Sequence, residues 1–352
     1  MDSLSTDEKY MLRCIEIAKN GLGTTAPNPM VGAVIVHKGK IIGEGYTSPF
    51  GGAHAEVNAI NAVVDTALLS ESCLYVTLEP CSHHGKTPPC ADLIVKHAIP
   101  RVVIGVKDPH DKVAGNGIKK LLDANCEVHV GVLENACADH HKRFLTFHIK
   151  KRPYIILKWA ETRDGFIAPK KELRANTPEP YWITEAPARQ LVHKWRSEEQ
   201  AILVGTTTVL EDNPRLDVRS WTGKAPVRIV LDASLKIKAH YHVLDGSQKT
   251  IVFTKNADKL HYKKGIDYVL LQSNNMVKDI CETLHKLHIQ SVIIEGGSQT
   301  LQSFISANVW DEARIFKGAV SFKKGVAAPV LKGKTTFTQQ LKNDQLIHIK
   351  ND

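Results

Sequence analysis

The stretches AHAEVNAI (residues 53–60) and TLEPCSHHGKTPPC (residues 77–90) decide how the first half of the chain folds. His54 and Glu56 stand two residues apart where a helix is expected to begin. Cys81 ends an expected strand, and Cys90 opens the next expected helix. One imidazole and two thiolates are three ligands for Zn²⁺, and the fourth tetrahedral position stays open for water, as in catalytic zinc sites. Both helix N-termini favour the thiolate form that binds metal. The pattern predicts a catalytic zinc site.

Glu56 is the expected proton carrier of this site. It lies outside the metal ligands, from where a carboxylate can take a proton from the metal's water and deliver it to a ring nitrogen and to departing ammonia. H-x-E followed by P-C-x-x-C is the signature of zinc nucleobase deaminases, but here eight residues, SHHGKTPP, separate the cysteines. A single Cys or His is usually structural, and His83 and His84 are alternative ligands. The combination of H-x-E with P-C…C, in this order along the chain, favours a catalytic zinc site over a structural role.

Length and composition indicate a globular enzyme with two domains. The 352 residues are 43% hydrophobic and 24% charged, which is enough for two cores. No apolar run approaches the roughly 18 to 20 residues of a membrane span. The first residues do not show the basic segment followed by an apolar segment that a secretory peptide has. Seven cysteines, odd in number and irregularly spaced, do not form a disulfide framework. We therefore expect a cytoplasmic protein without a membrane partner, whose thiols are free or metal-bound.

The net charge of +9 comes entirely from the second half of the chain. Residues 1–150 carry 15 Lys and Arg against 16 Asp and Glu, so that of the totals of 46 and 37, residues 151–352 carry 31 against 21. A field of this sign favours anionic ligands. A phosphorylated metabolite and a nucleic-acid backbone both fit it.

Strands and helices alternate in both halves, which predicts two α/β domains joined at KKRP, residues 150–153. The expected strands of the first half are VGAVIV, LYVTL and RVVIGV, and its expected helices are TDEKYMLRCIEIAKN, HAEVNAINAVV, PPCADLIVKHAI and GNGIKKLLDAN. The expected strands of the second half are YIILKWA, AILVGT, VRIVLDA, TIVFT, DYVLLQ and SVIIEGG, and its expected helices are TEAPARQLVHKWRSE and VKDICETLHKL. This alternation predicts largely parallel or mixed sheets covered on both faces. The tail after Pro329 predicts only an edge strand.

Three blocks of the first half resemble the deaminase domain of the bifunctional riboflavin-biosynthesis deaminase-reductase family. They are PNPMVGAVIV (residues 27–36), HAEVNAI (residues 54–60) and TLEPCSHHGKTPPCADLI (residues 77–94), and the long loop between the cysteines is a hallmark of that family. The resemblance implies a cytidine-deaminase-like three-layer α/β/α fold for residues 1–149. It also implies that Asn28 and Lys86 hold the substrate. Thr47 stands where relatives commonly carry histidine.

The second half resembles the reductase domain of the same family. The resemblance lies in KWAETRDGFIAP (residues 158–169), in residues 181–219 and in SVIIEGGSQTL (residues 291–301), and it implies a dihydrofolate-reductase-like α/β fold for residues 150–352. The implied NADPH contacts are Ala160, Trp182, Thr208, Asp212, Gly297, Ser298, Gln299 and Thr300. The implied contacts with the substrate are Arg196, Leu216, Arg219 and Glu295. The insertion PKKELRANTPEP (residues 169–180), which ends in Pro180 where a serine is usual, departs from most relatives.

Elementary chemistry adds to this assignment. EGGS (residues 295–298) puts two glycines and a hydroxyl between a strand and a helix, which offers free backbone N–H groups to a phosphate. The chain contains no G-x-G-x-x-G fingerprint, which argues against a Rossmann domain. Arginine suits a phosphate monoester because its planar fork donates two hydrogen bonds at once. Lys158 follows three apolar strand residues, and an inward ammonium is costly unless a ligand or carboxylate pairs with it, so we expect it to contact nucleotide or substrate.

The resemblance covers nearly the whole chain and implies a bifunctional zinc hydrolase and NADP-dependent oxidoreductase. It would deaminate 2,5-diamino-6-ribosylamino-4(3H)-pyrimidinone 5′-phosphate and then reduce the ribosyl group with NADPH, giving 5-amino-6-ribitylamino-uracil 5′-phosphate. The expected partner is this phosphorylated pyrimidine, with no nucleic acid, and the expected assembly is a homo-oligomer, dimer or tetramer. One alternative is a tRNA or nucleobase deaminase with a basic nucleic-acid-binding C-terminal domain. The other is a zinc-stabilised scaffold with a degenerate reductase domain.

Overall fold

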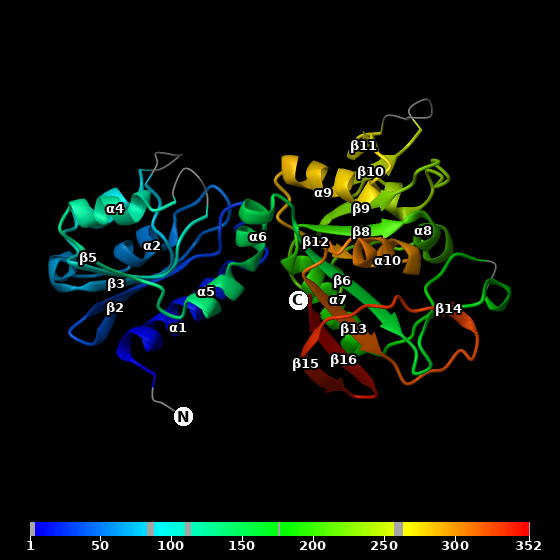
Figure 1. The fold of residues 1–352 in the computed structure, drawn as a ribbon, viewed down its shortest axis with the longest axis horizontal. Coiled ribbons are helices and arrows are strands. Elements are labelled where there is room, and N and C mark those ends of the chain that lie inside the picture. The colour runs from blue at the N-terminus through cyan, green and yellow to red at the C-terminus, as the bar shows by residue number, and fades with distance from the viewer. Residues whose placement is uncertain (1–3, 83–87, 110–113, 175–176, 257–262, 352) are drawn as a thin grey trace. The chain divides into compact units, whose positions relative to one another are not determined.

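The computed structural model describes residues 4–82, 88–109, 114–174, 177–256 and 263–351. The chain divides into two compact units, Met1–Lys151 and Arg152–Asp352 (Figure 1). Within the described ranges, no helix has both the length and the apolar character needed to cross a bilayer.

The first unit is built on a mixed sheet with the strand order β2-β1-β3-β4-β5. Strand β1 runs antiparallel to β2 and β3, whereas β3, β4 and β5 are parallel. The strands are β1 (Gly32–His37), β2 (Lys40–Tyr46), β3 (Cys73–Leu78), β4 (Arg101–Val106) and β5 (Glu127–Val130). The helices are α1 (Thr6–Ala18), α2 (Ala55–Asn61), α3 (Cys90–Lys96), α4 (Asn116–Asp123), α5 (Glu134–His140) and α6 (Lys142–Lys150).

Glycines on β1 and β2 let helices approach both faces of this sheet. A Cβ on Gly32 would lie 2.0 Å from the Cys14 carbonyl oxygen of α1, and a Cβ on Gly45 would lie 2.4 Å from the Ala59 nitrogen of α2. Gly45 pairs with the residue after Gly32, and successive strand residues point to opposite faces, so the two helices cover different sides. Figure 1 shows α1 and α5 on one side of the sheet and α2 and α4 on the other. The unit therefore has three layers.

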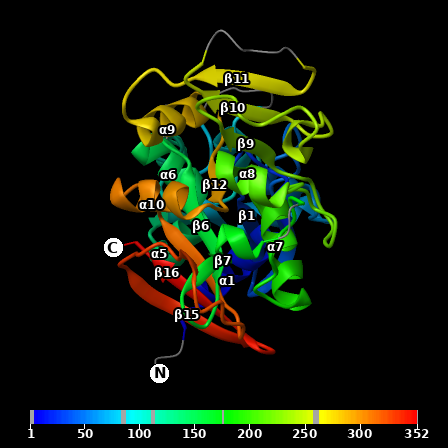
Figure 2. The same ribbon diagram turned by 90° about the vertical axis from the view of Figure 1, so that its right-hand side faces the viewer.

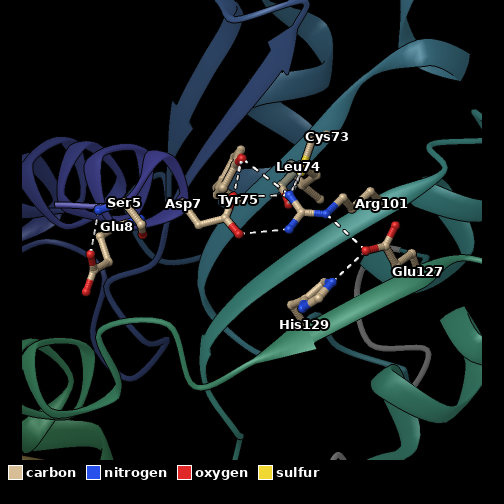
Figure 3. Close-up of polar contacts among 9 residues, drawn as sticks. All are labelled: Ser5, Asp7, Glu8, Cys73, Leu74, Tyr75, Arg101, Glu127 and His129. Carbon is tan, nitrogen blue, oxygen red and sulfur yellow. Dashed lines mark hydrogen bonds and ion pairs between the residues drawn. The ribbon is translucent and has the colours of Figure 1, made fainter.

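A capping box and an ion-pair cluster hold α1 in place (Figure 3). Ser5 Oγ accepts a hydrogen bond from the Glu8 N–H at 3.2 Å, and the Glu8 carboxylate accepts one from the Ser5 N–H at 2.7 Å. Arg101 of β4 donates to both oxygens of Asp7, at 2.8 and 3.1 Å. The Tyr75 hydroxyl of β3 donates to the same carboxylate at 2.8 Å. The first turn of α1 is thereby tied to two central strands.

The second unit is built on a larger sheet with the order β11-β10-β9-β8-β12-β6-β13-β16-β15 (Figure 2). Neighbouring strands from β11 to β13 are parallel. Strand β16 pairs antiparallel with β13, and β15 pairs antiparallel with β16. The strands are β6 (Tyr154–Glu161), β8 (Ala201–Gly205), β9 (Val227–Leu231), β10 (Thr250–Thr254), β11 (Ile266–Leu270), β12 (Ser291–Ile294), β13 (Glu312–Lys317), β15 (Lys334–Leu341) and β16 (Asp344–Lys350). Strands β7 (Phe166–Pro169) and β14 (Gly325–Ala327) pair separately.

Alternate residues of these strands enter two cores. Ile155 and Leu157 of β6 share a core with helices α9 (Met276–Lys286) and α10 (Ser298–Ser306). Tyr154 and Ile156 share the other core with α7 (Ala186–Glu198) and α8 (Thr206–Asp212). Burial on both faces explains why these strands are continuously apolar. Since β6, β8 and β12 are parallel, their carboxyl ends meet at one edge, where open α/β sheets bind ligands.

The expected strands were incomplete, since β5, β7, β13 and β14 are not among them. The tail after Pro329 forms the hairpin β15–β16 instead of an edge strand alone, and only β15 lies at the edge. Strand β2 was not predicted, because Gly43 and Gly45 resemble turn residues. In the fold they make room for α2: a Cβ on Gly43 would lie 2.3 Å from the Ala59 carbonyl oxygen.

Candidate metal site and ligand cavity

His54, Cys81 and Cys90 come together where β3 ends and two helices begin. His54 is the N-cap of α2, and Cys90 is the first residue of α3. His54 Nδ1 lies 3.3 Å from Cys90 Sγ and 3.6 Å from Cys81 Sγ. One ligand atom from each residue lies within 4.8 Å of the others. This donor set fits Zn²⁺ and leaves a fourth coordination position for water or substrate.

The surroundings of the two thiols favour metal binding. A hydrogen bond with Cys90, together with a smaller effect of His54, lowers the pKa of the Cys81 thiol to about 4 against the effect of burial. The Cys90 backbone N–H also donates to Cys81 Sγ at 3.3 Å. The pKa of Cys90 itself is raised by its hydrogen bond to Cys81 and by burial. A coordinated divalent cation deprotonates such a thiol, so a metal would hold both sulfurs as thiolates.

Glu56 is buried in the first turn of α2, next to this cluster. Burial is the main reason why the pKa of its carboxyl is raised to about 7, and the nearby Cys81 adds to the rise. A hydrogen bond with Cys90 acts in the opposite direction and places the carboxyl against the metal ligands. A group that titrates near neutral pH can both accept and release a proton, which general acid–base catalysis needs.

The structure shows less about the other residues expected at this site. Asn28 lies half-buried in the loop before β1, where its backbone N–H donates to the Thr25 carbonyl oxygen at 2.9 Å. Thr47 is buried, and its hydroxyl accepts a hydrogen bond from the Val31 N–H at 3.0 Å, so this side chain supports the fold. Lys86 and the alternative ligands, His83 and His84, lie outside the described residues. The substrate contacts of Asn28 and Lys86 stay predictions.

The second unit contains a cavity of about 1180 Å³ at the edge where β6, β8 and β12 end. This volume exceeds that of an ordinary small-ligand pocket and leaves room for a dinucleotide and a second ligand. All the residues that the resemblance assigns to NADPH or substrate in this half line the cavity, and so does Lys158, which its place on an apolar strand led us to expect there. They are Lys158, Ala160, Trp182, Arg196, Thr208, Asp212, Leu216, Arg219, Glu295, Gly297, Ser298, Gln299 and Thr300.

Positive charge dominates the lining of this cavity. Among the described residues, six cationic side chains line it against three acidic ones. The cations are Lys158, Arg174, Arg189, Arg196, Arg215 and Arg219, and the acids are Glu211, Asp212 and Glu295. The positive half of the sequence thus contributes to a concave site that suits phosphorylated ligands.

Glu295 organises one wall of the cavity. Lys158 Nζ donates to its Oε1 at 2.7 Å, and Arg196 Nη2 donates to its Oε2 at 2.7 Å. Burial works against ionisation of Glu295, but Arg196 and Lys158 outweigh it and lower the pKa of the carboxyl to about 2. The inward ammonium of Lys158 therefore has the carboxylate partner that its position on an apolar strand requires.

The turn at residues 295–298 is less open than expected. The Gly297 N–H donates to Thr208 Oγ1 at 2.8 Å, so the expectation of a free N–H was wrong at this position. The Ser298 hydroxyl donates to the Ala327 carbonyl oxygen at 2.9 Å. The N–H groups that follow, in the first turn of α10, have no acceptor within the helix, so they can donate to a phosphate in the cavity that these residues line.

Arg174 is a cavity residue that sequence reasoning missed. It belongs to the insertion, where its Nη2 donates to Asp212 Oδ1 at 2.6 Å and its Nη1 donates to Glu211 Oε2 at 3.1 Å. Burial raises the pKa of the Asp212 carboxyl, and Arg174 opposes this rise. No local pattern indicates this pairing, because the residues are far apart in the sequence.

Known proteins match both units. The model of the RibD C-terminal domain matches residues 153–352, and the model of the cytidine and deoxycytidylate deaminase zinc-binding region matches residues 4–106. The riboflavin biosynthesis protein RibD of Aquifex aeolicus is 42% identical over 88% of this chain and 86% of its own length. RibD of Bacillus amyloliquefaciens is 39% identical over 93% and 88%. The crystal structure of a diaminohydroxyphosphoribosylaminopyrimidine deaminase/5-amino-6-(5-phosphoribosylamino)uracil reductase from Thermotoga maritima is 37% identical, with a TM-score of 0.89 over 99% of both chains.

Fold, sites and matches define a two-domain enzyme, in which a cytidine-deaminase-like α/β/α domain is followed by a reductase domain with a dihydrofolate-reductase-like α/β fold. The expected fold class is confirmed. The chain belongs to the RibD family of bifunctional riboflavin biosynthesis proteins, which combine deaminase and reductase activities. Its cofactors are zinc and NADPH. This membership favours the bifunctional enzyme over a nucleic-acid deaminase and over a scaffold.

Proposed function

We propose that this enzyme deaminates 2,5-diamino-6-ribosylamino-4(3H)-pyrimidinone 5′-phosphate and then reduces the ribosyl group of the product to ribityl. Residues 1–149 would carry out the deamination and residues 150–352 the reduction. The observation that carries the proposal is the grouping of His54, Cys81 and Cys90 beside the buried Glu56, in a chain whose second unit holds a basic cavity. The Thermotoga maritima protein of the same length and fold is named for these two activities.

In the first domain, His54, Cys81 and Cys90 would hold zinc. The ion, when bound, acts as a Lewis acid that activates water for attack on the ring. Glu56 would carry two protons in turn. It would accept the first from the attacking water and release it to a ring nitrogen, and then take the second from the hydroxyl added to the ring and release it to the departing amine. Its pKa of about 7 supports this role, since both protonation states are accessible near neutral pH. We assign the binding of the substrate to Asn28 and Lys86.

In the second domain, we assign NADPH to the side of the cavity that is formed by Ala160, Trp182, Thr208, Asp212, Gly297, Ser298, Gln299 and Thr300. NADPH, when bound, supplies the hydride. Lys158, Arg196, Leu216, Arg219 and Glu295 would bind the ribosylaminopyrimidine phosphate. Arg219 is half-exposed at the cavity, so its guanidinium can reach a phosphate monoester. Lys158 Nζ donates to the buried Glu295 at 2.7 Å, which holds the ammonium at the cavity wall where we assign the substrate.

A two-stage assay tests this function. Purified protein is incubated with the diaminopyrimidinone phosphate, and ammonia release and NADPH oxidation are followed in the same tube. We expect ammonia first and NADPH oxidation second, in equal final amounts. Ammonia release without NADPH oxidation would contradict the reductase assignment, and the absence of both would contradict the substrate.

We further propose that the enzyme acts on this small molecule without nucleic acid, as a homo-oligomer in the cytoplasm. Membership of the RibD family supports a small-molecule substrate, and the seven cysteines, all present as thiols, support a reducing compartment. Filter binding with RNA at varied salt tests whether nucleic acid is bound, because a nucleic-acid enzyme would show affinity that falls steeply with salt. Light scattering tests whether the protein is a homo-oligomer, and fractionation of cells tests whether it lies in the cytoplasm.

A further inference from the structure

We propose that Glu79 is a positioning residue for the zinc ligand Cys81, and that it acts by binding the backbone N–H groups of Asp108, Gly115, Gly117 and Ile118. Glu79 lies between the end of β3 and Cys81, but neither its role nor that of its partners follows from the zinc signature. The proposal rests on the assignment of Cys81 as a ligand. It adds a requirement of this chain, which is that these four backbone groups must be held for the metal site to form.

The Glu79 carboxylate is buried and, among the residues that the structure describes, accepts four backbone hydrogen bonds. Oε2 accepts from the N–H groups of Asp108 at 3.3 Å and Gly115 at 3.1 Å. Oε1 accepts from those of Gly117 at 3.0 Å and Ile118 at 3.2 Å. Hydrogen bonds to an ionised acceptor are about twice as strong as neutral ones. Both oxygens are committed to these backbone groups, so Glu79 itself is not available as a metal ligand.

Gly117 also contacts the chain immediately before Cys81. A Cβ on Gly117 would lie 2.0 Å from the Pro80 carbonyl oxygen, so the start of α4 packs directly on the Pro80 backbone. The Glu79 N–H also donates to the Val106 carbonyl oxygen at 3.0 Å, which extends the pairing of β3 with β4 by one residue. The backbone on the N-terminal side of Cys81 is thus held by β4 and by α4.

On its other side Cys81 is held by α3. Its carbonyl oxygen accepts from the Ala91 N–H at 3.1 Å, and its Sγ accepts from the Cys90 N–H at 3.3 Å. The turn that presents the sulfur is therefore clamped between α3 and α4. A Zn–S bond of about 2.3 Å tolerates little displacement, and partners outside the ligand shell typically change metal affinity by about 10- to 100-fold. Removing the Glu79 clamp should let the Pro80–Cys81 turn move away from His54 and Cys90.

Zinc affinity of the full-length protein carrying Glu79→Gln tests the proposal. The amide keeps one accepting oxygen but turns its NH₂ toward two backbone N–H donors, so half of the clamp is lost. We expect a zinc dissociation constant about 10- to 100-fold higher, measured by competition with a chromophoric chelator. We also expect a weaker thiolate-to-metal charge-transfer band after loading with Co²⁺.

Asp232→Asn is the matched control. Asp232 is a buried carboxylate of the second unit that also accepts backbone N–H groups, from Lys236 at 3.0 Å and Ile237 at 2.8 Å. Its substitution should leave the zinc dissociation constant and the Co²⁺ spectrum unchanged. An equal loss of zinc affinity in both variants would overturn the proposal, because the effect would then come from general destabilisation.

A purely structural role for Glu79 gives a different result. The metal-free Glu79→Gln protein would then unfold at a lower temperature, while zinc affinity and the Co²⁺ spectrum well below that temperature would equal those of the parent, and the proposal would be wrong. If Glu79→Gln does not fold, Gly117→Ala keeps the carboxylate and displaces Pro80. Weaker zinc binding by this variant supports the proposal, and unchanged binding overturns it.

The ligand assignment is tested separately by Cys81→Ser. Undiminished zinc affinity in Cys81→Ser would show that the proposed metal site is wrong. Loss of zinc in Cys81→Ser, together with full affinity in Glu79→Gln and Gly117→Ala, would leave the metal site intact and refute only the role of Glu79.

Discussion

Burial gives Glu56 the properties that a proton carrier needs. Its carboxyl is surrounded by protein and not by water, which raises its pKa to about 7. Replacement by Gln keeps the shape and removes the proton transfer. We predict that Glu56→Gln lowers the rate of ammonia release by about 10²- to 10⁴-fold, the usual contribution of general acid–base catalysis. The bound zinc, measured by elemental analysis, should stay at the level of the parent.

The control for this variant lies in the same chain. NADPH-dependent reduction of supplied deaminated intermediate should proceed at the parental rate in Glu56→Gln, because that chemistry belongs to the second domain. Unchanged ammonia release with zinc still bound would show that Glu56 is not the proton carrier.

At the scale of residues, the sequence predicts best the side chains whose positions follow from short spacings within a motif. His54 and Glu56 are neighbours on one helix turn, Cys81 follows a recognisable strand and Cys90 begins a recognisable helix, so their grouping could be predicted without a structure. Arg174 could not be found in this way. Its partners, Glu211 and Asp212, are brought to it only by the path of the chain between β7 and α8.

At the scale of elements, the anchoring of α1 depends on pH. The hydrogen bond from Arg101 is the main cause of the lowered pKa of Asp7. A carboxyl whose pKa is lower in the folded state stabilises the fold at pH values above its unfolded pKa, and this stability is lost as the pH falls through the folded pKa. We predict that Asp7→Asn lowers the free energy of unfolding by about 1 kcal/mol at neutral pH. The difference from the parent should vanish as the pH falls below the folded pKa of Asp7.

Urea unfolding at neutral and acid pH measures this difference. Glu71→Gln is the control, since its partner Lys38 and Glu71 itself are 76% and 61% exposed and such a pair contributes little. A penalty for Asp7→Asn that stays constant down to acid pH would contradict the role of the ion pair.

The insertion at residues 169–180 should have a measurable effect on NADPH binding. Arg174 donates to Asp212, which we assign to the NADPH side of the cavity, and without Arg174 this half-buried carboxylate loses its cation. We predict that Arg174→Ala weakens NADPH binding about fivefold, the equivalent of about 1 kcal/mol, measured by titration of the cofactor fluorescence. Lys171→Ala is the control. Lys171 is 84% exposed, and its Nζ comes no nearer than 3.9 Å to Glu211 Oε1, so this ion pair is weak. Equal losses in the two variants would contradict a specific role for Arg174.

Most strands that are buried on both faces could be predicted from their sequence. Strand β8 is a short apolar run because cores lie on either side of it. Strand β13 is an exception, since Ala313 and Ile315 enter one core and Phe316 enters the other, but the strand was not predicted. The hairpin β15–β16 has no continuous apolar run, since nearly all of β15 faces solvent and its strand character comes from pairing with β16. In this hairpin the partner strand, and not the local sequence, determines the conformation.

At the scale of the whole molecule, each unit has its own sheet and cores, and each contains the residues proposed for one reaction. The two activities should therefore be lost independently. We predict that Cys81→Ser abolishes zinc binding and ammonia release but leaves NADPH-dependent reduction of supplied deaminated intermediate largely intact. Arg219→Ala should do the reverse, because it removes a cavity cation of the second unit that we assign to the substrate phosphate. Steady-state assays of both reactions on both variants, with circular dichroism to verify folding, measure this. Loss of both activities in either folded variant would mean that the domains work only as a coupled pair.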